Sequence, residues 1–218
     1  MSGRVVETRV LPAGDGLPIA VRTLEQGGLV AFPTDTVYGL GAHAFLPAAV
    51  GRIYEAKIRP AGKAIPLLVP DAGGLALVAR LVSEDARRLV EAFWPGALTI
   101  IVPRADIIPP VVAQGSKSVA VRAPNHPVAQ ALLRSVGAPL AVTSANISGR
   151  PALCTAQEVF AELRGKIDIV LDGGPCPLGV ESTIVDVTGA RPRIVRRGAI
   201  DAASLAAVVA LEGNGEVR

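Results

Sequence analysis

Short apolar runs alternate with segments of helical periodicity along most of the chain. The clearest runs are bounded by glycine, proline or polar residues, a pattern that favours buried β-strands: Leu29–Phe32, Leu98–Val102 and Leu140–Val142. Weaker patterns predict further strands at Val5–Val10, Ile65–Val69, Ser118–Val121, Ile167–Leu171, Val180–Val187 and Arg193–Val195. Strands that alternate with helices predict an α/β fold with a mixed sheet.

Helices are expected between these strands, and several carry start or stop signals. Pro47 suits a first helical position, and Thr155 with Glu158 forms a capping box. The predicted helices are Leu17–Gln26, a segment from Pro47 to Lys57, Ser83–Phe93 with Ser83 as N-cap, Pro127–Val136 stopped by Gly137, a helix from Thr155 to Leu163, and Asp201–Leu211. No boundary interrupts this alternation, so residues 1–218 are expected to form a single domain that ends in helix 201–211 and a frayed tail.

The stretch Ala31–Phe45 changes character abruptly at Pro33. An apolar strand gives way to Thr34, Asp35 and Thr36, and open α/β sheets usually bind ligands at such strand ends. We interpret Gly39 and Gly41 as positions of positive φ or of close ligand approach. An ordinary turn with capping hydroxyls is the alternative interpretation of the same residues.

Polar or cationic residues end several other predicted strands. They are Arg122, Ser144 with Asn146, Ser182 with Thr183, and Arg196. A sheet whose strand ends are all polar has a cleft to fill, so we predict a cationic, hydroxyl-lined cleft.

Lys57 occupies an unexpected position in its helix. Val50, Ile53 and Tyr54 mark the inward face, and Lys57 continues that series seven residues after Val50. Two interpretations stay open. Lys57 caps the last carbonyls of its helix and extends its amine to solvent, or it forms a phosphate-binding cluster with Arg59 and a third cation, Lys63.

Composition narrows the class of ligand. Half of the residues are apolar but only 3% are aromatic, which argues against a base-stacking surface for single-stranded nucleic acid. The net charge of +3 is scattered, and it suits an anionic small molecule as well as a polynucleotide. No signal-peptide core and no apolar run of ~18 residues occur, so we expect a soluble, cytoplasmic protein without a membrane segment.

The reactive side chains are few. Cys154 and Cys176 lack the spacing of a zinc site and indicate a reducing compartment. His43 and His126 lie in turn contexts typical of exposed or capping residues. A nucleophile–base pair, a P-loop and a GxGxxG motif are all absent from the sequence. Binding and charge neutralisation without side-chain acid–base chemistry favour phosphoryl or nucleotidyl transfer.

Five ordered motifs, PTDTVYGLG, the KxRP of Lys57–Pro60, SVAVRAP, TSANISG and GVESTIVD, resemble those of the YrdC/Sua5 family. The resemblance covers about residues 15–200 and implies a twisted, mixed open sheet with flanking helices around a concave basic cleft. It further implies the short, single-domain form, without the extra C-terminal domain of longer members.

The resemblance also implies an activity. The family makes L-threonylcarbamoyladenylate from L-threonine, bicarbonate and ATP for the t⁶A modification of tRNA, as a nucleotidyltransferase. By motif, the threonine contacts are Thr36, Arg122 and Ser182. The ATP contacts are Lys57, Arg59, Lys63, Ser118, Ser144, Asn146 and Arg196, with Lys57 and Arg59 stabilising charge on the phosphates. Mg²⁺ is expected with ATP, held mostly by phosphate oxygens and water; Asp35, Glu181 and Asp186 are left open as ligands.

Two positions depart from the family pattern. Leu68 stands where threonine-making members often carry a histidine, and Ala152 stands where some members carry a nucleotide-contacting serine. The identity of the amino acid is therefore left open. Three alternatives to the synthase remain: a double-stranded RNA or tRNA-binding module of the same fold, a paralogue with another carbamoyl or adenylyl substrate, and a carbamoyl-transfer domain of the hydrogenase-maturation type. Expected partners of the synthase include tRNA and the threonylcarbamoyl-transferase machinery.

Overall fold

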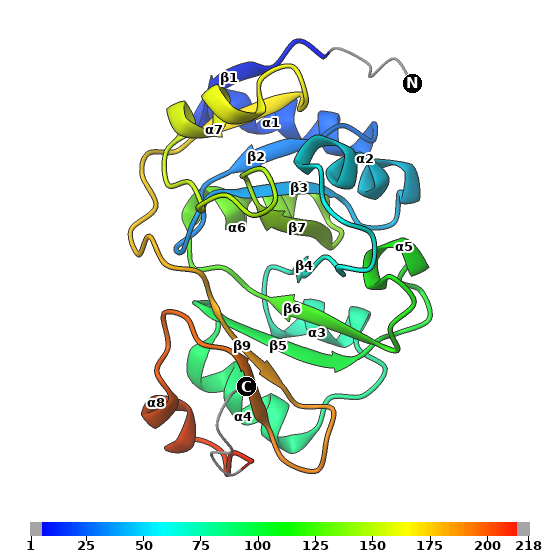
Figure 1. Cartoon of the computed structure of the whole chain (residues 1–218), viewed down its shortest axis with the longest axis vertical. Helices are drawn as coiled ribbons and strands as arrows, with labels where there is room; N and C mark the ends of the chain where they lie inside the picture. The colour runs from blue at the N-terminus through cyan, green and yellow to red at the C-terminus, as the bar shows by residue number, and fades with distance from the viewer. Residues whose placement is uncertain (1–5, 213–218) are drawn as a thin grey trace.

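The protein forms one ten-stranded sheet flanked by helices (Figure 1). The structure is a computed structural model that describes residues 6–212. The strands are β1 (Arg9–Pro12), β2 (Val30–Phe32), β3 (Gly39–His43), β4 (Leu67–Leu68), β5 (Leu98–Pro103), β6 (Ser118–Arg122), β7 (Leu140–Ser144), β8 (Ile169–Asp172), β9 (Thr183–Asp186) and β10 (Arg193–Arg196). The predicted α/β class with a mixed open sheet is confirmed.

The strand order is β1-β8-β2-β3-β7-β4-β6-β5-β9-β10. The sheet contains both kinds of pairing. The parallel pairs are β1 with β8, β2 with β8, β4 with β6 and β5 with β9, and the antiparallel pairs are β2 with β3, β3 with β7, β4 with β7, β5 with β6 and β9 with β10. Strands that lie far apart in the sequence therefore meet along the middle of the sheet.

The helices are α1 (Ala13–Glu25), α2 (Pro47–Lys57), α3 (Ala72–Val78), α4 (Glu84–Phe93), α5 (Pro110–Ala113), α6 (Pro127–Val136), α7 (Ala156–Leu163) and α8 (Ala202–Ala206). The predicted caps are confirmed. Ser83 accepts from the Ala86 amide, Thr155 and Glu158 form a reciprocal capping box, and Gly137 ends α6 with a φ of 67°.

Several element bounds differ from the sequence predictions. The first strand is Arg9–Pro12 because its partner β8 pairs with it from Ile169 to Asp172, and Val5 lies outside the described residues. The last helix ends at Ala206 instead of Leu211, and the predicted tail after residue 212 lies outside the described residues. The proline-rich segment 103–114 contains the short helix α5.

Strand β3 was not predicted, because Gly39 and Gly41 were interpreted as turn residues. Both are extended, and their missing side chains make room for neighbours on the same face. A Cβ on Gly41 would lie 2.9 Å from the Phe32 ring, and one on Gly39 would lie 2.7 Å from Val142. Close packing, not positive φ, explains these two glycines.

The core has two parts, one on each face of the β2–β3–β7 region. Phe32 packs with α1 and α6 on one face, where Leu24 and Leu132 are fully buried. The larger part contains Leu40 and Ile53 on the opposite face and continues under α3 and α4.

Alternation along β5 separates this core from a polar surface. Leu98, Ile100 and Val102 are fully buried in the core, whereas Thr99 and Ile101 point to the other face. That second face is the floor of a cleft. In the part of the chain that the structure describes, no helix has the length and hydrophobicity needed to span a bilayer.

Candidate active site

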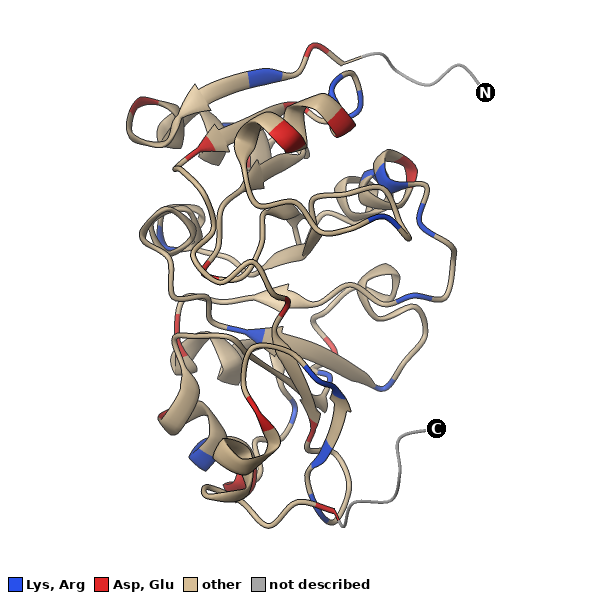
Figure 2. Cartoon of the chain, turned by 60° about the vertical axis from the view of Figure 1, so that its left-hand side comes forward, with Lys and Arg blue, Asp and Glu red and all other residues tan. Residues whose placement is uncertain are grey.

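A cleft of about 330 Å³ opens at the middle of the sheet, between β3 and β7 on one side and the β6–β5–β9–β10 half on the other, with β4 between them. It is lined by aliphatic side chains and by polar residues from seven separate segments: Thr34, Thr36, Arg59, Thr99, Arg122, Thr143, Ser144, Glu181, Ser182 and Arg196. Elsewhere the lysines and arginines are spread over many elements, not gathered into one stripe (Figure 2).

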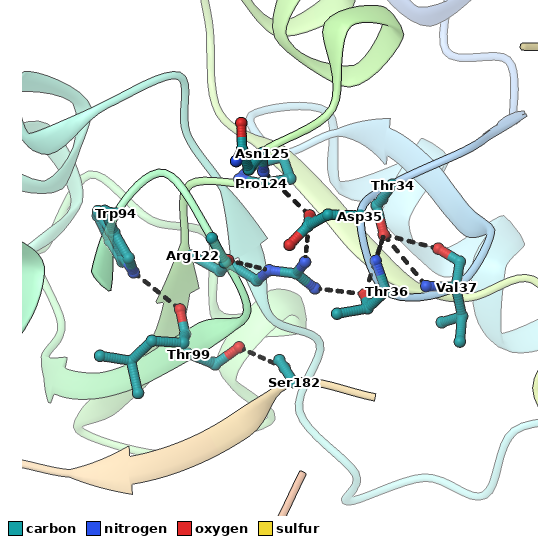
Figure 3. A network of polar contacts seen from close by, with 12 residues as sticks. Thr34, Asp35, Thr36, Val37, Trp94, Thr99, Arg122, Pro124, Asn125 and Ser182 are labelled. Carbon is teal, nitrogen blue, oxygen red and sulfur yellow. Dashed lines mark hydrogen bonds and ion pairs between the residues drawn. The ribbon is translucent and has the colours of Figure 1, made fainter. Parts of the chain in front are cut away.

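Arg122, at the end of β6, is held by three different partners (Figure 3). Its Nε donates to the Gly96 carbonyl at 2.8 Å, Nη1 donates to Thr36 Oγ1 at 2.7 Å, and Nη2 donates to Asp35 Oδ1 at 2.5 Å. The Asp35 carboxylate also accepts from the backbone amide of Asn125, so both members of this buried ion pair are fixed.

These contacts leave Arg122 able to bind a ligand. A guanidinium carries five N–H groups, and each terminal nitrogen uses one of its two within the protein. One N–H on each terminal nitrogen remains, and a carboxylate bound bidentately accepts from two such groups. Burial lowers the pKa of Arg122 and the adjacent Asp35 opposes that shift, while an arginine stays charged at neutral pH.

The loop that follows β2 is ordered by Thr34. Its Oγ1 accepts from the amides of Thr36 and Val37, donates to the Val37 carbonyl and contacts Thr36 Oγ1 at 2.9 Å. The capping interpretation therefore describes Thr34 correctly, while Thr36 turns to Arg122. The segment that contains Leu178 and Gly179 pairs with this loop. Its backbone amides at these two positions donate to the carbonyls of Asp35 and Thr36.

Ser182 lies across the cleft floor from this loop. Its hydroxyl contacts Thr99 Oγ1 at 2.8 Å and accepts from Arg196 Nη2 at 3.2 Å. Arg196 also donates to the Ser182 carbonyl and, from Nη1, to Glu181 Oε2 at 2.9 Å. Gly198 permits this arrangement, since a Cβ there would lie 2.3 Å from the Glu181 carbonyl oxygen.

Lys57 is buried behind the cleft instead of lining it. Its side chain is almost fully enclosed, and Nζ donates to the Ser144 carbonyl at 2.5 Å and to the Asn146 carbonyl. Desolvation lowers the pKa of Lys57 from 10.5 to about 8, assisted by Arg59. The amine thus holds the loop after β7, and it neither caps its own helix nor extends to solvent.

The helix end at Lys57 turns sharply to deliver Arg59. Ile58 has a φ of 52°, a left-handed conformation that β-branched residues rarely adopt. Arg59 then donates to the carbonyls of Lys63 and Ala64 and lines the cleft, whereas the Lys63 side chain is exposed.

The predicted site residues are therefore only partly brought together. Thr36, Arg59, Arg122, Ser144, Ser182 and Arg196 line one cleft. Asn146 is buried in the loop that Lys57 holds, where its Nδ2 donates to the carbonyls of Ile147 and Arg150. Ser118 lies at the start of β6 beside Ser116 and does not line the cleft. Of the two departures, Leu68 lines the cleft and Ala152 does not.

The histidines and cysteines stand apart from this chemistry. His126 is the N-cap of α6, and His43 accepts from the Phe45 amide, as the capping interpretation expected. Both cysteines are free thiols, and burial raises the pKa of Cys176 to about 11. Residues 6–212 contain no group of three His, Cys, Asp or Glu side chains able to hold a metal ion.

Sequence reasoning missed two contributors to the cleft. Thr99 is a lone hydroxyl residue in the otherwise aliphatic strand Leu98–Pro103, and this polar position was a signal of the cleft. Glu181 was noted only as one of three open carboxylates, and its place in the cleft depends on its contact with Arg196, fifteen residues further along the chain.

An open mixed sheet with a small arginine- and hydroxyl-lined cleft is typical of an α/β protein whose ligand is a small anionic molecule. The family described as Sua5_yciO_yrdC, telomere recombination, matches residues 22–198. The chain belongs to this family, which confirms the predicted resemblance.

Relatives agree with this assignment. The chain is 40% identical over 200 residues to a threonylcarbamoyl-AMP synthase of Pyrococcus abyssi, covering 92% of this chain and 57% of that protein. It is 42% identical over 191 residues to a threonylcarbamoyl-AMP synthase of Bacillus subtilis, covering 87% of this chain and 55% of that protein. The chain thus spans little more than half the length of both relatives.

A solved structure gives the same answer for the fold. P. abyssi Sua5 complexed with L-threonine superposes with a TM-score of 0.88 at 38% identity, over 94% of this chain and 60% of that one.

Proposed function

We propose that this chain condenses L-threonine, bicarbonate and ATP into L-threonylcarbamoyladenylate and pyrophosphate, the activated intermediate for the t⁶A modification of tRNA. The observation that carries the proposal is the guanidinium of Arg122, which hydrogen bonds to Gly96, Thr36 and Asp35 hold in place. It lies in a cleft that also contains Arg59 and Arg196. The relatives named threonylcarbamoyl-AMP synthase and the L-threonine complex of P. abyssi Sua5 support it.

The threonine half of the site would use the groups around Arg122. The two remaining guanidinium N–H groups would bind the α-carboxylate, and the hydroxyls of Thr36 and Ser182 would bind the polar atoms of the amino acid. Leu68 and Val142 line the same cleft and would contact the methyl group.

The nucleotide half would use Arg59, Ser144 and Arg196 in the cleft lining. Lys57 and Asn146 would form the wall behind Ser144, and Lys63 would extend from the loop that holds Arg59. For Ser118, the proposed ATP contact has no support from the cleft geometry, because Ser118 is not part of the lining.

The chemistry would need little from protein acids or bases. Bicarbonate gives CO₂ and hydroxide, and the hydroxide takes one proton from the ammonium group of threonine to form water. The free amine then bonds to the carbon of CO₂ and releases a second proton to solvent, which gives a carbamate. A carbamate oxygen then attacks the α-phosphorus, and the bond from that phosphorus to pyrophosphate breaks. The arginines would neutralise charge on the phosphates throughout. Mg²⁺ bound with ATP would add to this neutralisation, held by phosphate oxygens and water.

A component-omission assay tests the proposal. Pyrophosphate release from ATP is measured with chelator-treated protein and restored Mg²⁺, with no tRNA added. Release should require L-threonine and bicarbonate together, because omitting either removes the nucleophile. Arg122→Ala should raise the KM for threonine.

Two results would refute this function. Release without threonine would indicate a plain pyrophosphohydrolase or another acceptor. No release under any combination, together with salt-sensitive tRNA binding, would favour the RNA-binding module.

A further inference from the structure

Glu181 is the one carboxylate that lines the cleft within residues 6–212. Asp35 is buried and already accepts hydrogen bonds from Arg122 and from the backbone amide of Asn125. Asp186 lies outside the cleft, where it accepts from Thr188. The sequence left these three acidic residues equivalent, and the fold separates them.

The geometry of Glu181 leaves one oxygen for a ligand. Oε2 accepts from Arg196 Nη1 at 2.9 Å, while no donor among the described residues reaches Oε1. The Glu181 side chain is 44% exposed, and the residue lines the cleft. A single guanidinium separates the carboxylate from the Ser182 hydroxyl, because Arg196 contacts both.

The charge of the amino acid requires an acceptor of this kind. An amino acid at neutral pH is a zwitterion, and Arg122 can take only its carboxylate. The ammonium group would otherwise face Arg59, Arg122 and Arg196 without a compensating charge. Thr36 and Ser182 offer neutral hydroxyls, which suit the substrate hydroxyl better than a cation.

We propose that Glu181 binds the α-ammonium group of the amino-acid substrate through Oε1. Arg196 holds the carboxylate from the opposite side, and Gly198 keeps the two segments in contact. The cleft then has one charged group for each end of the zwitterion. This inference rests on the proposed function, because it needs an amino acid in this cleft.

Calorimetric titration of the full chain without nucleotide or metal tests the assignment. Two ligands are compared: L-threonine, and 2,3-dihydroxybutanoate, in which a hydroxyl replaces the amine. Glu181→Gln retains an oxygen that can accept from Arg196 but loses the charge. It should weaken L-threonine binding roughly 10- to 150-fold, while 2,3-dihydroxybutanoate binds as it does to the wild type. Asp186→Asn, the same change outside the cleft, should leave both affinities unchanged.

Three results would overturn the assignment. Equal losses for both ligands would mean that Glu181 acts only by positioning Arg196 and Ser182. Unchanged threonine binding to Glu181→Gln would by itself overturn it, and the proposed function would stand; a separate titration with ATP, in which the variant alters the Mg²⁺ dependence, would then make Glu181 a metal ligand. No threonine binding to the wild type would remove the inference and the proposed function together.

Discussion

The buried Lys57 should make the stability of the protein depend on pH above neutrality. Its pKa falls from 10.5 in an exposed lysine to about 8 in the native state, because burial penalises the charged amine. Below pH 8 the amine is charged in both states, and the native state bears the full penalty. Between pH 8 and 10.5 the unfolded chain keeps the proton that the native state has released, so stability rises with pH.

The size of this effect follows from the shift. A change from 10.5 to about 8 corresponds to about 3 kcal/mol, nearly all of which is regained by pH 10.5. The neutral amine keeps two N–H groups, which match the two carbonyl partners, Ser144 and Asn146. Deprotonation therefore removes the penalty without leaving a buried carbonyl unpaired.

Urea unfolding of the wild type and Lys57→Met from pH 7 to 10.5 measures this contribution. Both proteins contain the same tyrosines and cysteines. The titration of those side chains therefore cancels when the unfolding free energy of the variant is subtracted from that of the wild type. The difference in unfolding free energy should shift by about 3 kcal/mol in favour of the wild type as pH rises. Lys63→Met removes the same charge from an exposed side chain and should give a flat difference. A flat difference for Lys57→Met, or one that falls with pH, would refute the reasoning.

Two further substitutions probe the support of the cleft. Asp35→Asn leaves the buried guanidinium of Arg122 without its charge partner and should destabilise the protein by roughly 3–5 kcal/mol in urea unfolding; a loss under 1 kcal/mol would contradict the buried ion pair. Gly198→Ala forces a methyl group against backbone and should cost roughly 1–3 kcal/mol. Its control, Gly51→Ala, places a methyl in open space on α2 and should stabilise by up to ~1 kcal/mol in thermal melts, so equal effects would contradict the packing argument.

Local signals predicted the elements better than the site. Capping boxes, prolines and glycine stops depend on neighbouring residues, which explains why Ser83, Thr155 and Gly137 were interpreted correctly. Helix α3 was missed because its Ala- and Gly-rich sequence lacks a strong period, although Asp71 caps it. Strand β3 was missed because its glycines make room for Phe32 on β2 and Val142 on β7. A local sequence pattern does not reveal such contacts.

The site depends on contacts that no local pattern contains. Motif resemblance selected Arg122 and Thr36, which are 86 residues apart in the sequence. The fold places Arg122 Nη1 2.7 Å from Thr36 Oγ1. The same resemblance could not distinguish Lys57, which lies behind the cleft, from Arg59, which lines it. Both are cations in one motif, and the left-handed turn at Ile58 separates them.

The position of β9 beside β5 has a consequence for synthesis on the ribosome. β5 is complete at Pro103, but its parallel partner ends at Asp186. At 5–20 residues per second, the outer edge of this aliphatic strand stays unpaired for roughly 4–17 s. Such an edge can pair with other chains. The nascent chain is therefore exposed to misassembly during this interval, and the cleft acquires Glu181, Ser182 and Arg196 only when its last strands are in place.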